Sequence, residues 1–285
     1  LLLVPLVAGP PDSRAMLRVQ VVDFGQGLAV LVRTRNSALL YDTGPSWSGG
    51  GSAARSRLLP LLHDLGLPRV DRILISHSDS DHAGGAAVLS AAYPRARLYS
   101  PQPLGDVATR DCSAGQSWTW DGVRFTVLHP GLRQRRLRAS DNDLSCVLLV
   151  ETSAARLLLT GDVSRRAEAA MLRHFPRGNV DVLIAPHHGS RSSSGQALVA
   201  ATRPRYVVFA AAFQNRWGFP HADVAARWAG VGACLLSSGE HGSLSFTAAT
   251  GEPLRLAGAS RRDRRGAWTW GSVPATCDGP VAPVK

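Results

Sequence analysis

The segment from Ile73 to Gly85 concentrates metal-binding residue types in one short turn. A buried apolar strand is followed by two histidines and two aspartates within six residues: His77, Asp79, Asp81 and His82. Carboxylates this close together repel one another and lose hydration when they are buried. A divalent cation removes both costs. The segment therefore predicts a metal site, and the alternative is a solvated acidic turn that contains histidines by coincidence.

Three other apolar segments also end in residues that can bind a metal ion. These residues are Asp42, Asp162, and the pair His187 and His188. Residues at strand ends converge on one edge of a sheet, where function commonly sits in layered α/β folds. A Gly-Asp turn is weak evidence by itself, and a His-His pair after a strand is moderately specific. The four segments in this order predict one shared metal centre.

The order of the predicted elements indicates a layered α/β domain. Strands, a helix and more strands occur twice, which predicts two halves stacked as an αββα sandwich. The chain has 285 residues, of which 45% are apolar, enough to bury a sizeable core. We expect one domain at 17–250 and a basic C-terminal tail at 251–285. The apolar residues 1–16 are either the stub of a preceding transmembrane segment or an ordinary buried strand.

The chain carries a formal charge of +11, and Lys285 is its only lysine. An arginine excess of this size favours polyanionic partners, either nucleic acid or an anionic membrane surface. A GC-rich genome would explain arginine in place of lysine, but not the excess of basic over acidic residues. Solvated surface arginines are the alternative. The candidate nucleic-acid contacts are Arg133, Arg135, Arg136, Arg138 and Arg216.

The four cysteines contain no Cys-x-x-Cys pair, so a zinc ribbon is not expected. Cys146 and Cys234 lie in apolar, strand-like runs and are predicted to be core thiols. Cys112 and Cys277 lie in polar segments. In an oxidising compartment, these two could form a disulfide that fastens the tail to the domain. Two free thiols are the alternative.

With these motifs the sequence resembles the metallo-β-lactamase superfamily. The superfamily's His-x-His-x-Asp-His motif corresponds to residues 77–82, and its aspartate motifs correspond to Asp42 and Asp162. Over roughly residues 17–250, the chain resembles more closely the C-terminal domain of the ComEC family of DNA-uptake channel proteins. The segments that carry this closer resemblance are Val22 to Gly27, Asn142 to Ser145, His187 to Ser190 and Gly218 to His221.

The resemblance implies two divalent metal ions in one site. The ligands that it implies for the first metal are His77, Asp79 and Asn142. Those that it implies for the second metal are Asp81, His82 and either His188 or His187. Asp162 would bridge the two metals.

Two positions depart from the superfamily pattern in the same direction. Asp79 stands where the superfamily has a histidine, and Asn142 lies near the place of another. Both changes exchange nitrogen for the harder ligand oxygen, which favours Mn²⁺ or Mg²⁺ over Zn²⁺. The ComEC-type pattern shares both departures. We therefore expect two divalent metal ions, with Mn²⁺ favoured.

Other polar residues near these motifs are expected to support the chemistry. Asp42 would brace the ligands by hydrogen bonding, as carboxylates behind metal ligands do. Asp23 would do the same, or would simply cap the end of a strand. His221 would protonate a leaving oxygen or bind a phosphate, or would belong to an ordered surface loop. The catalytic set that we expect is Asp81, Asp162 and His221.

The resemblance implies a metal-dependent nuclease that hydrolyses phosphodiester bonds of DNA, on the strand that is not imported. Two cations about 3.5–4 Å apart suit in-line attack on such a bond. The expected partners are single-stranded DNA and the transmembrane channel domain of the same full-length protein, with no small-molecule cofactor. The expected location is the periplasmic side of the inner membrane. The alternatives are an inactive DNA-binding or gating module, and a hydrolase of this fold that acts on a small substrate.

Overall fold

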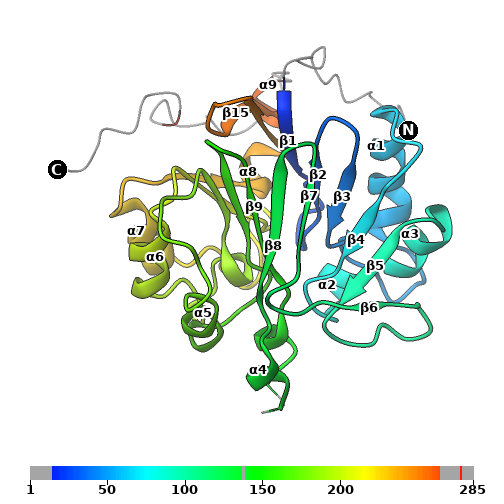
Figure 1. Cartoon of the computed structure of the whole chain (residues 1–285), viewed down its shortest axis with the longest axis horizontal. Helices are drawn as coiled ribbons and strands as arrows, with labels where there is room; N and C mark the ends of the chain where they lie inside the picture. The colour runs from blue at the N-terminus through cyan, green and yellow to red at the C-terminus, as the bar shows by residue number, and fades with distance from the viewer. Residues whose placement is uncertain (1–14, 137–138, 264–276, 278–285) are drawn as a thin grey trace.

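The computed structural model describes residues 15–136, 139–263 and 277, and it contains two facing β-sheets covered by helices (Figure 1). The first sheet has eight strands in the order β15-β14-β1-β2-β3-β4-β5-β6. Its strands are β1 (Ala15–Val21), β2 (Val30–Arg33), β3 (Ala38–Tyr41), β4 (Arg72–Leu74), β5 (Arg97–Ser100), β6 (Arg110–Asp111), β14 (Leu244–Ala249) and β15 (Arg255–Ala259). The pairs from β3 to β6 are parallel, and the others are antiparallel.

The second sheet has seven strands in the order β13-β12-β11-β10-β9-β8-β7. These are β7 (Ser117–Trp120), β8 (Val123–His129), β9 (Val147–Glu151), β10 (Arg156–Leu159), β11 (Val182–Ile184), β12 (Tyr206–Phe209) and β13 (Cys234–Ser237). The pairs from β10 to β13 are parallel. Parallel strands bring their carboxyl ends to the same edge, so β3 and β4 in one sheet and β10 and β11 in the other can present side chains to one site.

Helices pack on the outer face of each sheet. The first sheet carries α1 (Leu59–Asp64), which continues the π-helix η1 (Ala54–Leu58), and α3 (Ala86–Ala92). The second sheet carries α5 (Arg165–Met171), α6 (Gln196–Thr202) and α7 (Ala222–Ala229). The remaining short elements are α2 (Ser80–Ala83), α4 (Leu132–Arg136), η2 (Asn142–Leu144), η3 (Pro186–Gly189), α8 (Ser238–His241) and α9 (Ser260–Asp263).

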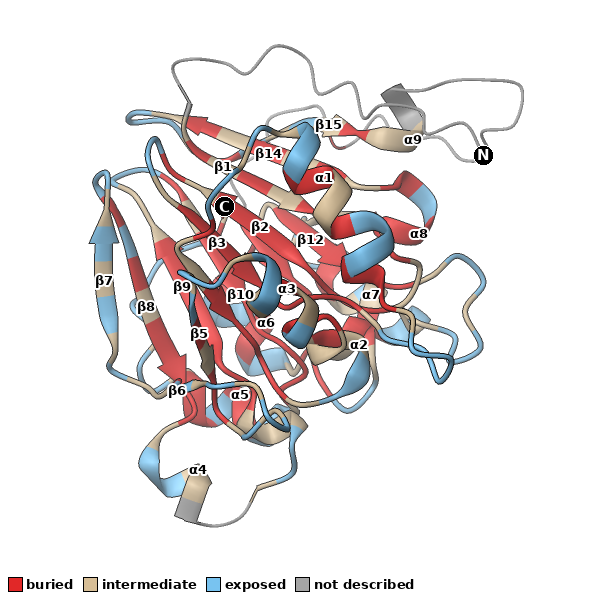
Figure 2. Cartoon of the chain, turned by 90° about the vertical axis from the view of Figure 1, so that its right-hand side faces the viewer, coloured by how far each residue is buried: buried red, intermediate tan, exposed pale blue. Residues whose placement is uncertain are grey.

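Apolar side chains form three buried layers in this arrangement. Alternate residues of the facing strands fill the space between the sheets, as the two-residue period of a strand requires. The central strands of the sheets are mostly buried (Figure 2). A second layer lies under η1, α1 and α3, and a third lies under α5, α6 and α7, where Trp228 is fully buried. The predicted αββα sandwich is confirmed.

The structure extends past the predicted end of the domain at residue 250. β15 lies within the segment 251–285, which the sequence predicted to be a basic tail, and it pairs with β14 at the edge of the first sheet. Residues 1–14 of the predicted stub at 1–16 lie outside the described residues. The two remaining residues belong to β1, which begins at Ala15. Among the described residues, no helix is long and apolar enough to cross a membrane.

The cysteines pair differently from the prediction. Cys112 is bonded to Cys146 and Cys234 is bonded to Cys277, so the predicted pairing of Cys112 with Cys277 and the two predicted core thiols are wrong. Cys112 is buried just after β6, and Cys146 is buried just before β9, so this bond joins the two sheets. The pairing depends on contacts between sheets, which the polarity of the flanking sequence does not encode.

The disulfide between Cys112 and Cys146 is expected to stabilise the fold. The two cysteines are 34 residues apart, and a loop of this size corresponds to about 4 kcal/mol of stabilisation. The double variant Cys112→Ser/Cys146→Ser should therefore lower the free energy of unfolding in urea by about that amount. Under reducing conditions, this difference from the wild type should shrink strongly. Equal unfolding midpoints for the two oxidised proteins would contradict the expectation.

Candidate metal centre

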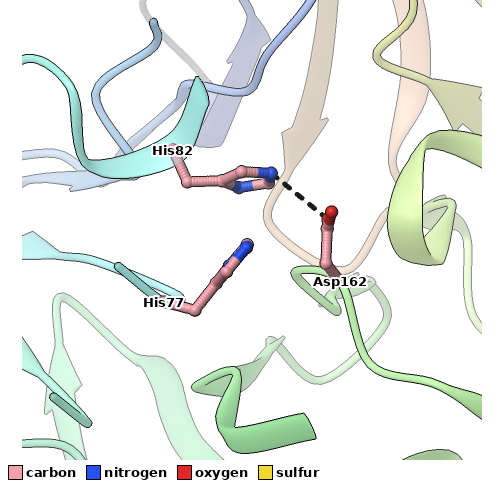
Figure 3. A group of neighbouring side chains, drawn as sticks. All are labelled: His77, His82 and Asp162. Atoms are coloured by element: carbon pink, nitrogen blue, oxygen red, sulfur yellow. Dashed lines mark ion pairs between the residues drawn. The ribbon is translucent and has the colours of Figure 1, made fainter. Parts of the chain in front are cut away.

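The predicted metal-binding turn follows β4 and continues into α2. β4 delivers Ser76 and His77 to the edge of the sheet, and α2 turns back at once, with Asp81 and His82 in its single turn. The side chains of His77 and His82 therefore lie side by side, with ring centroids 4.2 Å apart (Figure 3). Asp162, which follows β10 in the other sheet, points toward both rings.

His77, His82 and Asp162 form a buried group that can hold a metal ion. Their potential ligand atoms all lie within 4.8 Å of one another, and Nε2 of His82 is 3.2 Å from Oδ1 of Asp162. Nε2 of His77 is buried and has no hydrogen-bond partner among the described residues. Burying an imidazole nitrogen without a partner is costly, and a cation would satisfy it. The donor set therefore fits a divalent metal.

A second group shares His82 and adds Asp81 and His188. Nε2 of His188 lies 3.3 Å from Oδ2 of Asp81, 3.6 Å from Oδ2 of Asp162 and 3.2 Å from Nε2 of His82. Asp162 thus faces both groups with its two oxygens, the position that a bridging ligand requires. The two groups therefore adjoin each other, and each could hold a metal ion.

The remaining predicted ligands lie at the margin of these groups. Oδ2 of Asp79 is 3.5 Å from Nε2 of His77, and this carboxylate is half-exposed. Nε2 of His187 is 3.8 Å from Oδ2 of Asp162, while its Nδ1 lies 3.2 Å from the hydroxyl of Ser192. Between the two adjacent histidines, the geometry favours His188 as the ligand.

Asp42 fixes the orientation of His82 from behind. It is fully buried, and its Oδ2 lies 2.8 Å from Nδ1 of His82. The same carboxylate accepts hydrogen bonds from the backbone N–H and the hydroxyl of Ser76. With Nδ1–H held by Asp42, Nε2 of His82 is left to face the metal groups. The structure thus places Asp42 in the predicted bracing position.

Two serines support the site, although the sequence analysis gave neither a role. The Ser76 hydroxyl lies 3.0 Å from Nδ1 of His77, and the Ser145 hydroxyl accepts a hydrogen bond from the backbone N–H of Asp162. Gly161 permits this approach, because a Cβ at that position would lie 2.8 Å from the Cβ atoms of both serines. Serine is too common to mark such positions, and only its place next to a predicted ligand could have indicated them.

The backbone is strained where it presents the ligands. Asp42, His187 and His188 have φ angles of 60°, 49° and 54°, in the left-handed region that non-glycine residues rarely adopt. Local hydrogen bonds hold the turn at η3 in this form: the His187 N–H donates to the Gly161 carbonyl, and the Ser193 hydroxyl donates to the Pro186 carbonyl. Strain at these positions fits a site that is preorganised for a ligand.

The electrostatics of the cluster also fit a cation. Burial opposes the charged form of His82, but the carboxylates of Asp162 and Asp42 outweigh burial and raise the pKa of His82 well above its usual value. Burial likewise opposes ionisation of Asp162, but His82 and His188 hold the pKa of Asp162 well below its usual range. Burial also opposes ionisation of Asp81, but the hydrogen bond from His188 and the charges of His82 and His188 together outweigh burial and lower the pKa of Asp81 to about 2. Ionised carboxylates thus surround a centre that binds positive charge.

Three predicted site residues lie outside the two groups. Asp23 pairs with Arg261 at 2.9 Å and accepts the Gly25 N–H, so it caps the end of its strand, as the alternative interpretation had it. Asn142 begins η2, next to Asp141, which accepts a hydrogen bond from Ser78. His221 precedes α7, and its backbone N–H donates to the Gly189 carbonyl beside His188.

The predicted nucleic-acid contacts divide into two sets. Arg135 forms an ion pair with Asp111 at 2.6 Å and donates to the carbonyls of Cys112 and Pro101, so it fastens the chain locally. Arg133 lines a pocket of about 450 Å³, and Arg216 lies over the Trp217 ring. Arg138 and the side chain of Arg136 lie outside the described part of the chain.

One hydrogen bond connects the pocket that Arg133 lines to the loop after Asp162. Two arginines of α5, Arg166 and Arg173, line this pocket with Arg133 and Asp143. Asp143 accepts a hydrogen bond from the N–H of Ser164, which lies two residues after Asp162. Three arginines thus line one concave surface, and the residues of the two metal groups do not belong to its lining.

The sequence and the fold were compared with those of known proteins. The family model of the metallo-β-lactamase superfamily matches residues 22–108. Recombination protein 2 of Haemophilus influenzae is 37% identical over 217 residues, which are 75% of this chain and 27% of that protein. Competence protein ComA of Neisseria gonorrhoeae is 38% identical over 238 residues, which are 83% of this chain and 33% of that protein.

The solved structures lead to the same fold. The metallo-β-lactamase fold protein YhfI from Bacillus subtilis superimposes with a TM-score of 0.50 at 14% identity, over 78% of this chain and 96% of that protein. The chain spans about a quarter to a third of the length of the two curated relatives. The chain therefore belongs to the metallo-β-lactamase superfamily and is homologous to one part of the competence proteins of the ComEC family.

Proposed function

We propose that this chain is a metal-dependent phosphodiesterase domain that cleaves DNA. The observation that carries the proposal is the buried Nε2 of His77, which has no hydrogen-bond partner among the described residues and belongs to one group with His82 and Asp162. An arginine-lined pocket is connected to the loop after Asp162. A cation site supplies hydrolytic chemistry, and the arginines supply affinity for phosphate. Neither feature alone would distinguish DNA from a small substrate.

The residues have separate roles in this proposal. His77, Asp79 and Asp162 would hold one metal ion, and the resemblance adds Asn142 to this set. Asp81, His82 and His188 would hold the other, and Asp162 also faces this group. When bound, two divalent ions would activate water and neutralise charge on the scissile phosphate. His221 protonates the leaving oxygen, and Asp42 keeps His82 oriented.

In this proposal, the arginine-lined pocket would bind phosphates of the DNA backbone. Arg133, Arg166 and Arg173 would contact the backbone of DNA on either side of the scissile bond. A small uncharged substrate would gain nothing from three arginines in one pocket. The proposed metal is Mn²⁺, because carboxylate and amide oxygens occupy two positions where the superfamily has histidines.

We further propose that the chain works beside a transmembrane channel domain on the periplasmic side of the inner membrane. Two disulfide bonds favour an oxidising compartment. The relatives are named for competence and recombination, and they extend well beyond the region that this chain matches. In that setting, the DNA strand that is not imported would be the substrate.

The substitution Asp162→Asn should abolish the activity. It removes the carboxylate that faces both metal groups, so cleavage of linear and circular single-stranded DNA with Mn²⁺ should fall by at least about 100-fold. Mg²⁺ and Zn²⁺ would be compared in parallel, and the surface variant Asp64→Asn is the control. If Asp162→Asn remained active, the metal assignment would be wrong. DNA binding without cleavage by the wild type, with any of these metals, would indicate a binding or gating module.

Metal binding should release a proton and weaken as the pH falls. In the metal-free protein, Asp162 and Asp42 raise the pKa of His82, so near neutral pH a bound metal must displace the proton on Nε2. Below this pKa, the Mn²⁺ affinity should drop about tenfold per pH unit. Titration calorimetry in two buffers of different ionisation enthalpy would measure the released proton. An affinity that is constant between about pH 6 and pH 8 would contradict this expectation.

A further inference from the structure

The loop between β12 and α7, residues 213–221, exposes aromatic side chains next to the metal centre. Trp217 is 44% exposed and Phe213 is 58% exposed; among the described residues, only Trp47 and Leu132 join them as exposed large apolar side chains. A single exposed aromatic ring needs no explanation. Two such rings in one nine-residue loop beside a metal cluster indicate a contact surface.

The rings of this loop form a series that leads from the surface to the cluster. Trp217 and Phe219 have centroids 6.3 Å apart and planes inclined by 15°. Phe219 and His188 have centroids 6.4 Å apart and planes inclined by 24°. The three planes are therefore nearly parallel, and the inner one belongs to a residue of the second metal group. A ligand stacked on the outer ring would lie two ring-to-ring steps from His188.

The loop is held in this shape before any ligand arrives. The Asn215 side chain donates to the carbonyls of Ala212 and Phe219 and accepts the N–H of Phe219. The His221 N–H then fastens the end of the loop to the Gly189 carbonyl. Prearranged rings lose little conformational entropy on binding, which favours a recognition role.

A cation sits on the outer ring. The Arg216 guanidinium lies 4.4 Å from the centroid of Trp217. Flat aromatic faces combined with arginine are the means by which proteins bind single-stranded nucleic acid, because every base has a face that can stack. In a duplex, neighbouring bases cover those faces. An apolar protein partner would gain nothing from Arg216, and the chain's net charge of +11 favours a polyanion.

We propose that Trp217, Phe219 and Arg216 form a stacking platform that binds bases of single-stranded DNA and positions the adjoining phosphate at the metal centre. This inference rests on the proposed DNA substrate and adds the residues that would select its single-stranded form. Trp217 and Phe219 act as positioning residues. The arginines of the α5 pocket contact phosphates, whereas the platform contacts bases.

Binding without metal tests the platform independently of cleavage. Fluorescence anisotropy would compare a single-stranded oligonucleotide, an abasic oligonucleotide of the same length, and a duplex. In the wild type, the base-containing single strand should bind at least about fivefold more tightly than the abasic strand. Trp217→Ala should remove this difference and leave abasic binding unchanged. Trp217→Phe should keep part of it, because the smaller ring still stacks.

Trp47→Ala is the matched control, because Trp47 is also an exposed tryptophan but lies in a different loop from the platform. The loop of Trp47 contacts α2 through a hydrogen bond from the Ser46 N–H to the Ser80 carbonyl. Its effect on binding should be less than about twofold. Quenching of a 2-aminopurine base by the wild type, and its loss in Trp217→Ala, would show stacking directly.

The outcomes separate the platform from the proposed function. If Trp217→Ala binds the base-containing strand like the wild type, or if Trp47→Ala weakens it equally, the platform is wrong, whatever the metal centre does. If wild-type binding shows the base dependence but no metal supports cleavage, the platform stands and the proposed nuclease fails. In an active enzyme, Trp217→Ala should raise the KM for single-stranded DNA more than it lowers kcat.

Discussion

The site depends on one electrostatic constraint: several carboxylates are buried together where two sheets meet. Asp42 and Asp162 are almost fully buried, and the ion pairs found for them among the described residues are with histidines. Without a metal, the protein compensates this charge by binding a proton at His82 between the two carboxylates. A proton supplies one positive charge to the site, whereas divalent cations would supply more positive charge. A cation would also bind Nε2 of His77, which has no hydrogen-bond partner among the described residues.

The sandwich fold makes this charge arrangement possible. β3 and β4 bring Asp42, His77 and His82 from the first sheet, and β10 and β11 bring Asp162 and His188 from the second. Parallel pairing within each sheet aligns the strand ends, and the apolar layer between the sheets fixes the distance across the site. The strained turns at Asp42 and His188 persist because this packing holds both ends of each turn.

The sequence was sufficient to predict the fold and the histidines and aspartates that meet between the sheets. These residues directly follow strands, which is a pattern that a local stretch of sequence shows. It did not predict pairings between distant segments. Arg135 pairs with Asp111, and Asp23 pairs with Arg261 across 238 positions, and neither pairing leaves a local signal. The bracing serines were missed for a different reason, since their role arises only when Gly161 brings them close to the ligands. His187 and His188 have similar backbone conformations, and only their distances to Asp81, Asp162 and His82 in the folded chain single out His188 as the better-placed candidate.

The disulfide between Cys112 and Cys146 links stability to the site. Cys146 follows Ser145, which holds the backbone of Asp162, and the Cys146 N–H donates to the carbonyl of Ser76, which holds Asp42. The covalent bond to Cys112 therefore restrains the one short segment that contacts bracing groups from both sheets. The crosslink therefore ties the stability of the fold to the positions of Asp42 and Asp162, which belong to different sheets.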